Sequence, residues 1–171
     1  MNKLTGKTLG CFFLFFLFIF PSLASGDNLK KIVLDNGLTV LINEMPSCPM
    51  AAVYAWIKTG SANEGKYVGS GITHFVEHML FKGTARRGAG VIPDEAHAMG
   101  GSINASTSRD FTVFTLSIPR DNFSKGLDLI SDMVQHAAFD PQEVERERRL
   151  GRRLGEHPVL RNLDVPVSVH C

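Results

Sequence analysis

Two histidines and a glutamate stand close together in the segment His74-Phe75-Val76-Glu77-His78. If this segment is helical, the two imidazoles are separated by about 400° of rotation and lie on one face. From that face both rings can reach a single tetrahedral Zn²⁺, which accepts neutral imidazole nitrogens. Glu77 is close enough to take a proton from a water molecule that the metal activates. The order His-x-x-Glu-His is the inverse of the common zinc-peptidase arrangement and predicts a hydrolytic zinc site. The alternative is an ordinary amphipathic helix whose histidines only make hydrogen bonds.

The residues around this motif resemble the pitrilysin-type (M16) zinc metallopeptidases, the family of insulin-degrading enzyme and the mitochondrial processing peptidase. The resemblance runs in order and spacing through five segments: 34–42, 56–61, 71–84, 99–107 and 139–148. It implies a layered α+β fold, Zn²⁺ as the cofactor and a peptide or protein as the substrate. It also implies that Glu147 lies in the shell around the metal ligands and orients one of the histidines.

The resemblance assigns a substrate-binding role to residues 101–107. In the family this run is an edge strand beside the metal, to which an extended peptide adds by backbone hydrogen bonds. Asn104 and Ala105 are then expected to line the cleft, with Asn104 contacting the substrate backbone. Alternatively, Asn104 only satisfies a turn.

The expected third zinc ligand is missing from its position. The family supplies it as a Glu on a helix, seven residues after the counterpart of Glu147, but this chain has Leu154 there. Glu156 is the nearest acid, and its extra two residues add about 200° of rotation, which places it on the opposite side of a regular helix. Either the helix breaks and Glu156 swings in, or Glu147 itself binds, or residues 149–171 are a truncated or out-of-frame end of a longer gene.

The N-terminal residues 1–26 are typical of an export signal. Lys3 and Lys7 precede the apolar run 11–20, and small residues up to Gly26 offer a cleavage site. Even when it is extended to Leu23, the run is too short for a stable membrane anchor, because it spans about 20 Å against a hydrocarbon core of about 30 Å. We therefore expect an exported protein, periplasmic or secreted.

Charge and cysteine content exclude other classes. Cleavage after Gly26 removes two of the 18 basic residues and none of the 17 acidic ones. The remaining 16 basic and 17 acidic side chains nearly cancel, which gives no reason to expect a nucleic-acid partner. Cys48 and Cys171 could form one disulfide, and free thiols are equally compatible.

Periodicity predicts the elements that position these groups. Strands are expected at 32–34, 39–42, 51–58, 102–108 and 111–118, the first two joined by an Asn-Gly hairpin turn. Helices are expected at 93–99 and 121–138, from a cap at Ser70 or Thr73 to Lys82, and from a cap at Asp140. The 121–138 helix has apolar residues at helical spacing: Phe123, Leu127, Ile130, Val134 and Ala138. The prediction is an α+β domain, an antiparallel sheet with helices packed on one face, over an incomplete M16 half-domain at 27–148.

The sequence thus predicts a zinc metalloendopeptidase in which His74 and His78 bind zinc and Glu77 is the general base. By the resemblance, a second M16 domain or subunit closes the chamber around the peptide. The rival is a catalytically inactive peptide-binding fragment or partner subunit without the third zinc ligand. A domain that needs no metal is a further alternative.

Overall fold

The computed structural model describes residues 29–154, which divide into two units at Met45 and Pro46. The first unit contains a hairpin of β1 (Leu29–Val33) and β2 (Thr39–Asn43), paired antiparallel. Gly37 at its turn has φ +84°, a conformation that favours glycine, so the predicted Asn-Gly turn is confirmed. The proposed signal at 1–26 and both Glu156 and Cys171 lie outside the described residues.

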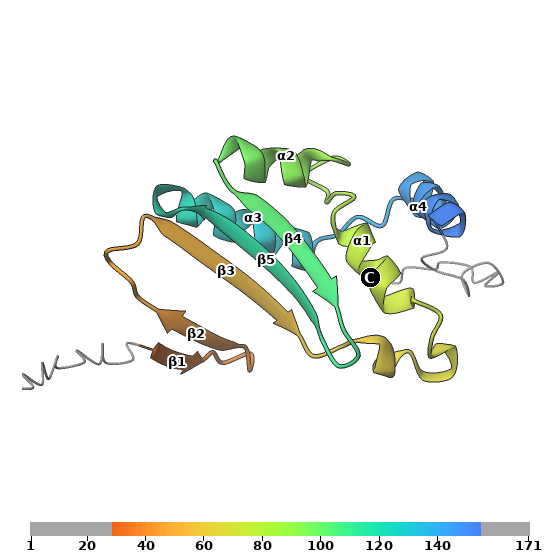
Figure 1. Ribbon diagram of the computed structural model, residues 1–171, viewed down its shortest axis with the longest axis horizontal. Helices are drawn as coiled ribbons and strands as arrows, with labels where there is room; N and C mark the ends of the chain where they lie inside the picture. Colours follow the sequence, from red (N-terminus) through yellow and green to blue (C-terminus); the bar gives the residue numbers. More distant parts are fainter. Residues whose placement is uncertain (1–28, 155–171) are drawn as a thin grey trace, which may run out of the picture. The chain divides into compact units, whose positions relative to one another are not determined.

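The second unit is built on a three-stranded antiparallel sheet (Figure 1). Its strands are β3 (Met50–Ile57), β4 (Ser102–Thr107) and β5 (Thr112–Pro119), in the order β3-β5-β4. Ala105 lies opposite Phe114, and Phe114 lies opposite Ala55. The strand with the predicted substrate residues, β4, is therefore at one edge of this sheet.

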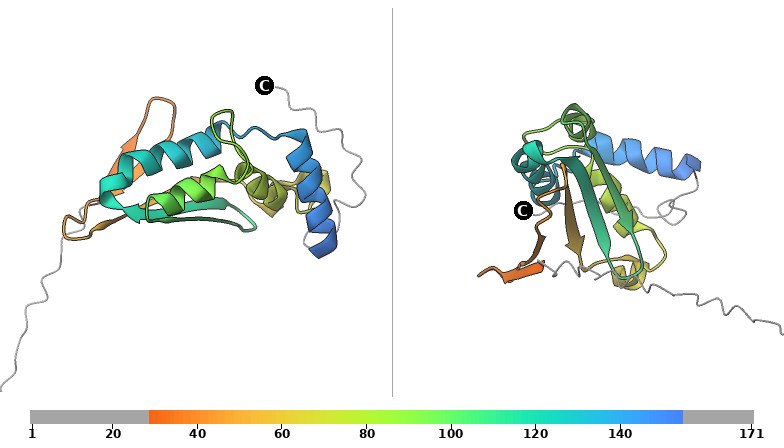
Figure 2. Two further views of the ribbon diagram at one scale, coloured as in Figure 1. Left: turned by 90° about the horizontal axis from the view of Figure 1, so that it is seen from above. Right: turned by 60° about the vertical axis from the view of Figure 1, so that its left-hand side comes forward.

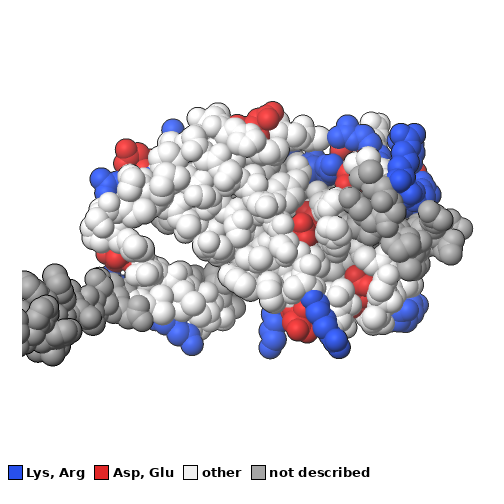
Figure 3. Space-filling view, in the orientation of Figure 1, with Lys and Arg blue, Asp and Glu red and all other residues white. Residues whose placement is uncertain are grey.

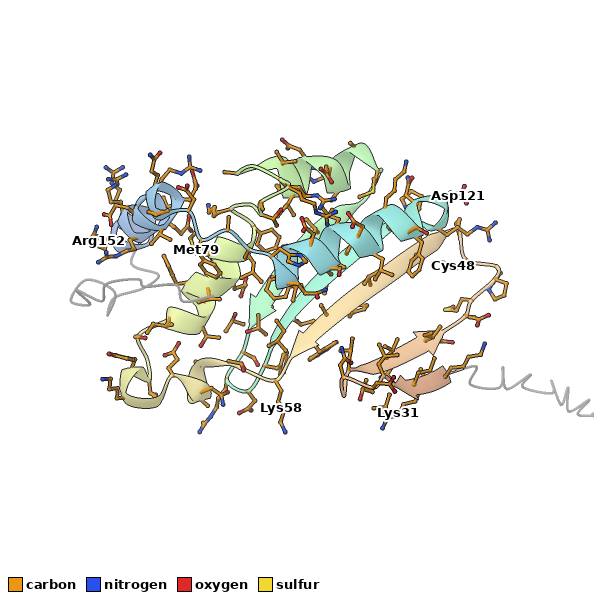
Figure 4. The ribbon with its side chains drawn as sticks, turned by 180° about the vertical axis from the view of Figure 1, so that it is seen from behind. Lys31, Cys48, Lys58, Met79, Asp121 and Arg152 are labelled. Atoms are coloured by element: carbon orange, nitrogen blue, oxygen red, sulfur yellow. The ribbon has the colours of Figure 1, made fainter. Side chains whose placement is uncertain are left out.

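Helices cover one face of the sheet, as the sequence predicts for an α+β domain. α2 (Val91–Ala98) and α3 (Phe123–Gln135) lie side by side over it, while α1 (Ile72–Leu80) packs on the edge strand (Figure 2). Figure 4, seen from behind, shows α3 lying across the strands. α4 (Pro141–Leu154) lies beside α1 and continues past Arg148.

The core forms where these helices meet the central strand. Phe114, Leu116 and Ile118 alternate along β5 and are buried against Leu129 and Met133 of α3. The other face of the sheet carries no helix among the described residues of this unit, and Figure 3 shows it largely without charged side chains. Lys and Arg side chains gather instead over α4.

The buried face of α3 agrees only in part with the face that its apolar periodicity predicts. Ile130 is buried and Val134 packs against the core, as predicted, but Phe123 and Leu127 are exposed. Leu129 and Met133 are buried as well. Gly126 explains the difference, because a Cβ there would lie 2.2 Å from Ile118 Cδ1. The glycine lets the helix approach β5 on that side, which the count of apolar residues does not reveal.

A buried aspartate fastens the loop after α1 to α3. Asp132 has a side chain only 1% exposed and accepts hydrogen bonds from Thr84 Oγ1 (2.7 Å), Arg86 Nε (3.0 Å) and Arg87 Nη1 (2.6 Å). Burial raises the pKa of Asp132, but these hydrogen bonds outweigh it, so the pKa lies well below its ordinary value. The carboxylate therefore holds the segment that follows α1.

Replacing Asp132 with Asn is expected to destabilise the chain by about 3 kcal/mol, because it leaves buried donors without their charged partner. Urea unfolding at pH 7 measures this loss. The stabilisation is present above the unfolded pKa of about 3.9 and disappears as the pH falls below it, since the folded pKa is lower. The gap between wild type and variant should therefore shrink below about pH 4. Asp128→Asn is the matched control, because Asp128 pairs with the same arginines from an exposed position, and its effect should be much smaller. Equal losses for the two variants would contradict the prediction.

In residues 29–154, no helix combines the length and the apolar character needed to cross a membrane.

Candidate metal centre

The helix that carries the His-x-x-Glu-His motif begins differently from the sequence prediction. Gly71, at φ +76°, takes the cap position in place of the predicted Ser70 or Thr73, although Ser70 Oγ still accepts a hydrogen bond from the Ile72 backbone N–H at 3.3 Å. Glu64 supplies a further acceptor, because its Oε1 accepts a hydrogen bond from the Thr73 backbone N–H at 3.0 Å. A carboxylate at this end also suits the partial positive charge of a helix N-terminus. The helix ends at Leu80, two residues before the predicted end at Lys82.

The two histidines of α1 aim the same ring nitrogen at one point. His74 Nε2 and His78 Nε2 lie 3.1 Å apart, and the ring planes are 82° from parallel. Two nitrogens bound to one tetrahedral Zn²⁺ at 2.0–2.1 Å lie about 3.3 Å apart. The donors of Glu77 and both histidines all fall within 4.8 Å of one another. The spacing therefore fits a single zinc ion.

Glu147 on α4 fixes the orientation of one of these rings. Its Oε1 lies 2.7 Å from His78 Nδ1, and its side chain is 5% exposed. Donation from Nδ1–H to the carboxylate leaves the lone pair of Nε2 for a metal. The structure thus brings Glu147 to the position that its expected orienting role requires.

The second oxygen of Glu147 is also engaged. Lys82, in the turn after α1, places its Nζ 2.7 Å from Oε2. Burial raises the pKa of Glu147, but hydrogen bonds from Lys82 and His78 outweigh it and hold the pKa below its ordinary value. Glu147 is therefore a carboxylate at neutral pH, with one oxygen for each partner.

Glu77 is held by a residue that sequence reasoning did not select. Glu77 is 7% exposed, and its Oε2 accepts a hydrogen bond of 2.5 Å from Thr107 Oγ1 on β4. Thr112 Oγ1 lies 3.3 Å from the Thr107 hydroxyl and donates to Thr59 O at 2.9 Å. A hydroxyl has one proton, and Thr107 donates its proton to the hydrogen bond with Glu77. One carboxylate oxygen is thereby fixed to the edge strand.

The two predicted substrate residues lie on opposite faces of β4. Ala105 is on the helix-covered face, two residues before Thr107, whereas Asn104 is exposed on the open face. Asn104 Oδ1 accepts a hydrogen bond from the Ala105 N–H at 2.9 Å. That amide is therefore directed away from β5, toward the free edge of the sheet.

No acidic side chain stands at the position where the family has its third zinc ligand. Leu154, seven residues after Glu147, is the last residue of α4. The helix does not break before it, although Gly151 lies within the last turn. Glu147 is unsuited to the part, because both its oxygens already have partners at 2.7 Å. Within residues 29–154, the converging donors remain His74, Glu77 and His78.

Three contacts of this centre had no signal strong enough for prediction. They join residues far apart in sequence or outside any motif: Glu64 at the helix start, Lys82 beside Glu147, and Thr107 beside Glu77. For Thr107 a partial signal existed, since strand alternation places it on the same face as Ala105. Cys48 is a free thiol in the segment before β3, and it takes no part in the centre.

The known proteins that this chain resembles are named as peptidases. Residues 39–155 match the sequence model of the family described as Insulinase (Peptidase family M16). An uncharacterized zinc protease YmxG of Bacillus subtilis is 33% identical over 122 residues, 71% of this chain and 30% of that protein. The mitochondrial-processing peptidase subunit beta of Blastocladiella emersonii is 38% identical over 123 residues, 72% of this chain and 26% of that protein.

A solved structure is similar as well. The crystal structure of a protease from Helicobacter pylori superposes with a TM-score of 0.70 and 29% identity, over 75% of this chain and 31% of that one. The chain thus spans between 26% and 31% of the length of these three proteins.

Proposed function

Because the chain belongs to the insulinase family of peptidases (peptidase family M16), we propose that it is the metal-binding part of a zinc metalloendopeptidase. The observation that carries the proposal is the convergence of His74 Nε2 and His78 Nε2 at 3.1 Å, beside the buried carboxylate of Glu77. Possible metal ligands that converge on one point beside a buried carboxylate are the expected geometry of a metal-assisted hydrolytic site. Two imidazoles held in this way are also the donors that zinc prefers.

Zinc bound there would supply a Lewis acid and lower the pKa of water. His74 and His78 would hold the ion, and Glu147 would keep the His78 ring in the tautomer that binds it. Glu77 would accept the proton of the water that attacks the peptide carbonyl, and would then donate it to the leaving amine. Thr107 restrains one oxygen of Glu77, which leaves the other for this proton transfer.

The substrate we propose is an extended peptide or protein segment added to the free edge of β4. Backbone hydrogen bonds of this kind accept many sequences. The Ala105 N–H is a donor on that edge, and Asn104 Oδ1 accepts its hydrogen bond. A substrate carbonyl would replace this side-chain oxygen, and Asn104 would then contact the substrate backbone.

Two further proposals follow from the family. A second M16 domain or subunit would complete the peptide chamber, since the chain spans less than a third of the relatives compared here. The apolar stretch near the N-terminus would direct export, to the periplasm or the medium.

Zinc binding and peptide hydrolysis together test the proposed function. The full chain, titrated with Zn²⁺ against a chromophoric chelator, is expected to bind about one equivalent. It should also cleave a long fluorogenic peptide, and excess chelator should abolish the cleavage until zinc is restored. Less than about a tenth of an equivalent of bound zinc would overturn the proposal.

A second candidate is a catalytically inactive peptide-binding subunit. It is favoured by Leu154 at the position of the third ligand and by the full engagement of Glu147. One equivalent of zinc without any hydrolysis, together with peptide binding, would favour this candidate over the first.

A further inference from the structure

Lys82 is the cation that shares the Glu147 carboxylate with a metal-site histidine. His78 Nδ1 and Lys82 Nζ each lie 2.7 Å from a different oxygen of Glu147. The two side chains are four residues apart, at the last turn of α1 and just beyond it, so they approach the carboxylate from the same side. Both lie on one short segment of the chain, whereas Glu147 comes from α4.

Because the Glu147 carboxylate is buried, each of its oxygens needs a hydrogen-bond donor from the protein. Glu147 has a side chain 5% exposed, and Lys82 has one 25% exposed. A buried carboxylate oxygen without a donor is costly, so the carboxylate would turn toward other partners if one were removed. Turning it would move Oε1 away from the His78 ring.

Five other charged residues of α4 are paired with each other. Arg146 contacts Glu143 at 2.9 Å, whereas Arg148 and Arg152 contact Glu145 at 3.4 and 3.3 Å. The lysine that pairs with Glu147 comes from the segment after α1. The pairing of Lys82 with Glu147 therefore joins α4 to the metal-site helix.

We propose that Lys82 is a positioning residue for zinc: it locks the Glu147 carboxylate so that Oε1 holds the His78 ring for metal binding. This inference rests on the proposed zinc site. The proposal predicts that removing the Lys82 cation weakens zinc binding, which is the opposite of the purely electrostatic expectation. Coulomb repulsion alone predicts that removing a cation near a zinc site tightens zinc binding. Loss of positioning predicts the opposite.

Zinc affinity of variants of the full chain, measured by competition with a chromophoric chelator, tests the proposal. Lys82→Met is expected to weaken Zn²⁺ binding by about tenfold, the lower end of the range for partners that orient a ligand. Lys82→Arg keeps a cation within reach of the carboxylate and should stay within about threefold of wild type. Arg146→Met is the matched control, because it removes one positive charge from α4 without touching Glu147, and it should not weaken binding.

A double-mutant cycle gives the sharpest result. Glu147→Gln alone should weaken zinc binding by about 10- to 100-fold. If Lys82 acts only through Glu147, then Lys82→Met added to Glu147→Gln should cause no further loss. Additive losses, tighter binding by Lys82→Met, or unchanged binding would each overturn the proposal.

Two measurements keep the outcomes distinct. Circular dichroism and urea unfolding without zinc check that each variant is folded, and Lys82→Gln replaces Lys82→Met if the latter does not fold, with the same direction expected. Failure of the wild-type chain to bind zinc would count against the proposed function itself. Normal wild-type binding with an unchanged Lys82 variant would refute only the positioning role.

Discussion

Replacing Glu77 with Gln is expected to lower the rate of peptide hydrolysis by about 10³-fold while zinc binding stays close to that of the wild type. General-base catalysis contributes roughly 10²- to 10⁴-fold, and an amide cannot accept the proton. Gln has nearly the same shape as Glu, and its amide oxygen can still accept the hydrogen bond from Thr107 Oγ1. The position of the side chain should therefore be kept and only its chemistry lost.

The measurement combines initial rates on a fluorogenic peptide with zinc content after dialysis. Glu44→Gln is the matched control, because it makes the same chemical change at an exposed carboxylate of the first unit that pairs with Lys30. Its hydrolysis rate should match that of the wild type. An active Glu77→Gln variant would show that Glu77 is not the base.

The same variant also tests another role for Glu77. With Leu154 where an acidic ligand is expected, Glu77 is the remaining carboxylate among the converging donors of residues 29–154. If Glu77 binds the metal, zinc content and hydrolysis should fall together in Glu77→Gln. Retained zinc with lost hydrolysis supports the base, because a ligand cannot be removed without cost to affinity.

Substituting either histidine of the motif is expected to have the larger effect on the metal itself. Residues that merely orient a ligand change zinc affinity by 10- to 100-fold, so loss of a ligand should exceed that range. We expect His74→Ala and His78→Ala each to weaken zinc binding by more than about 100-fold. The structural reason is that a single imidazole cannot replace two Nε2 atoms fixed 3.1 Å apart.

Competition with a chromophoric chelator measures these affinities. His97→Ala is the matched control, because it removes an exposed imidazole on α2 and should leave zinc affinity unchanged. Circular dichroism of the metal-free variants checks that the fold is kept. Equal losses in His78→Ala and His97→Ala would mean that the chain binds zinc without a specific site.

Protein contacts hold the side chains of this centre in place, although its ligand set is incomplete. His78 is anchored by a charged, buried partner, and Glu77 by a hydroxyl on the neighbouring sheet edge. Both side chains are therefore oriented before any metal binds, which lowers the entropy cost of assembling the site. Preorganisation of this kind is consistent with either catalysis or a retained metal-binding role in a partner subunit.

The sequence by itself determined the elements and the local chemistry. The His-x-x-Glu-His spacing required only a helix to place His74 and His78 one turn apart, and α1 is that helix. The Asn-Gly turn, the strand alternation of β5 and the Asp140 cap are likewise set by neighbours in the chain; Asp140 Oδ1 accepts hydrogen bonds from the N–H groups of Gln142 and Glu143. These features follow from the backbone geometry of a few consecutive residues.

Tertiary structure decided the contacts by which distant side chains complete the centre, although the family resemblance had already implied an orienting role for Glu147. Thr107 reaches Glu77 across 30 positions and Glu147 reaches His78 across 69, pairings that no local period encodes. On α3, the close approach of Gly126 to Ile118 accompanies the burial of Leu129 and Met133 beside the predicted Ile130. Such contacts depend on how α1, α4 and the edge of the sheet pack together, because a hydrogen bond forms only where packing brings donor and acceptor within about 3 Å.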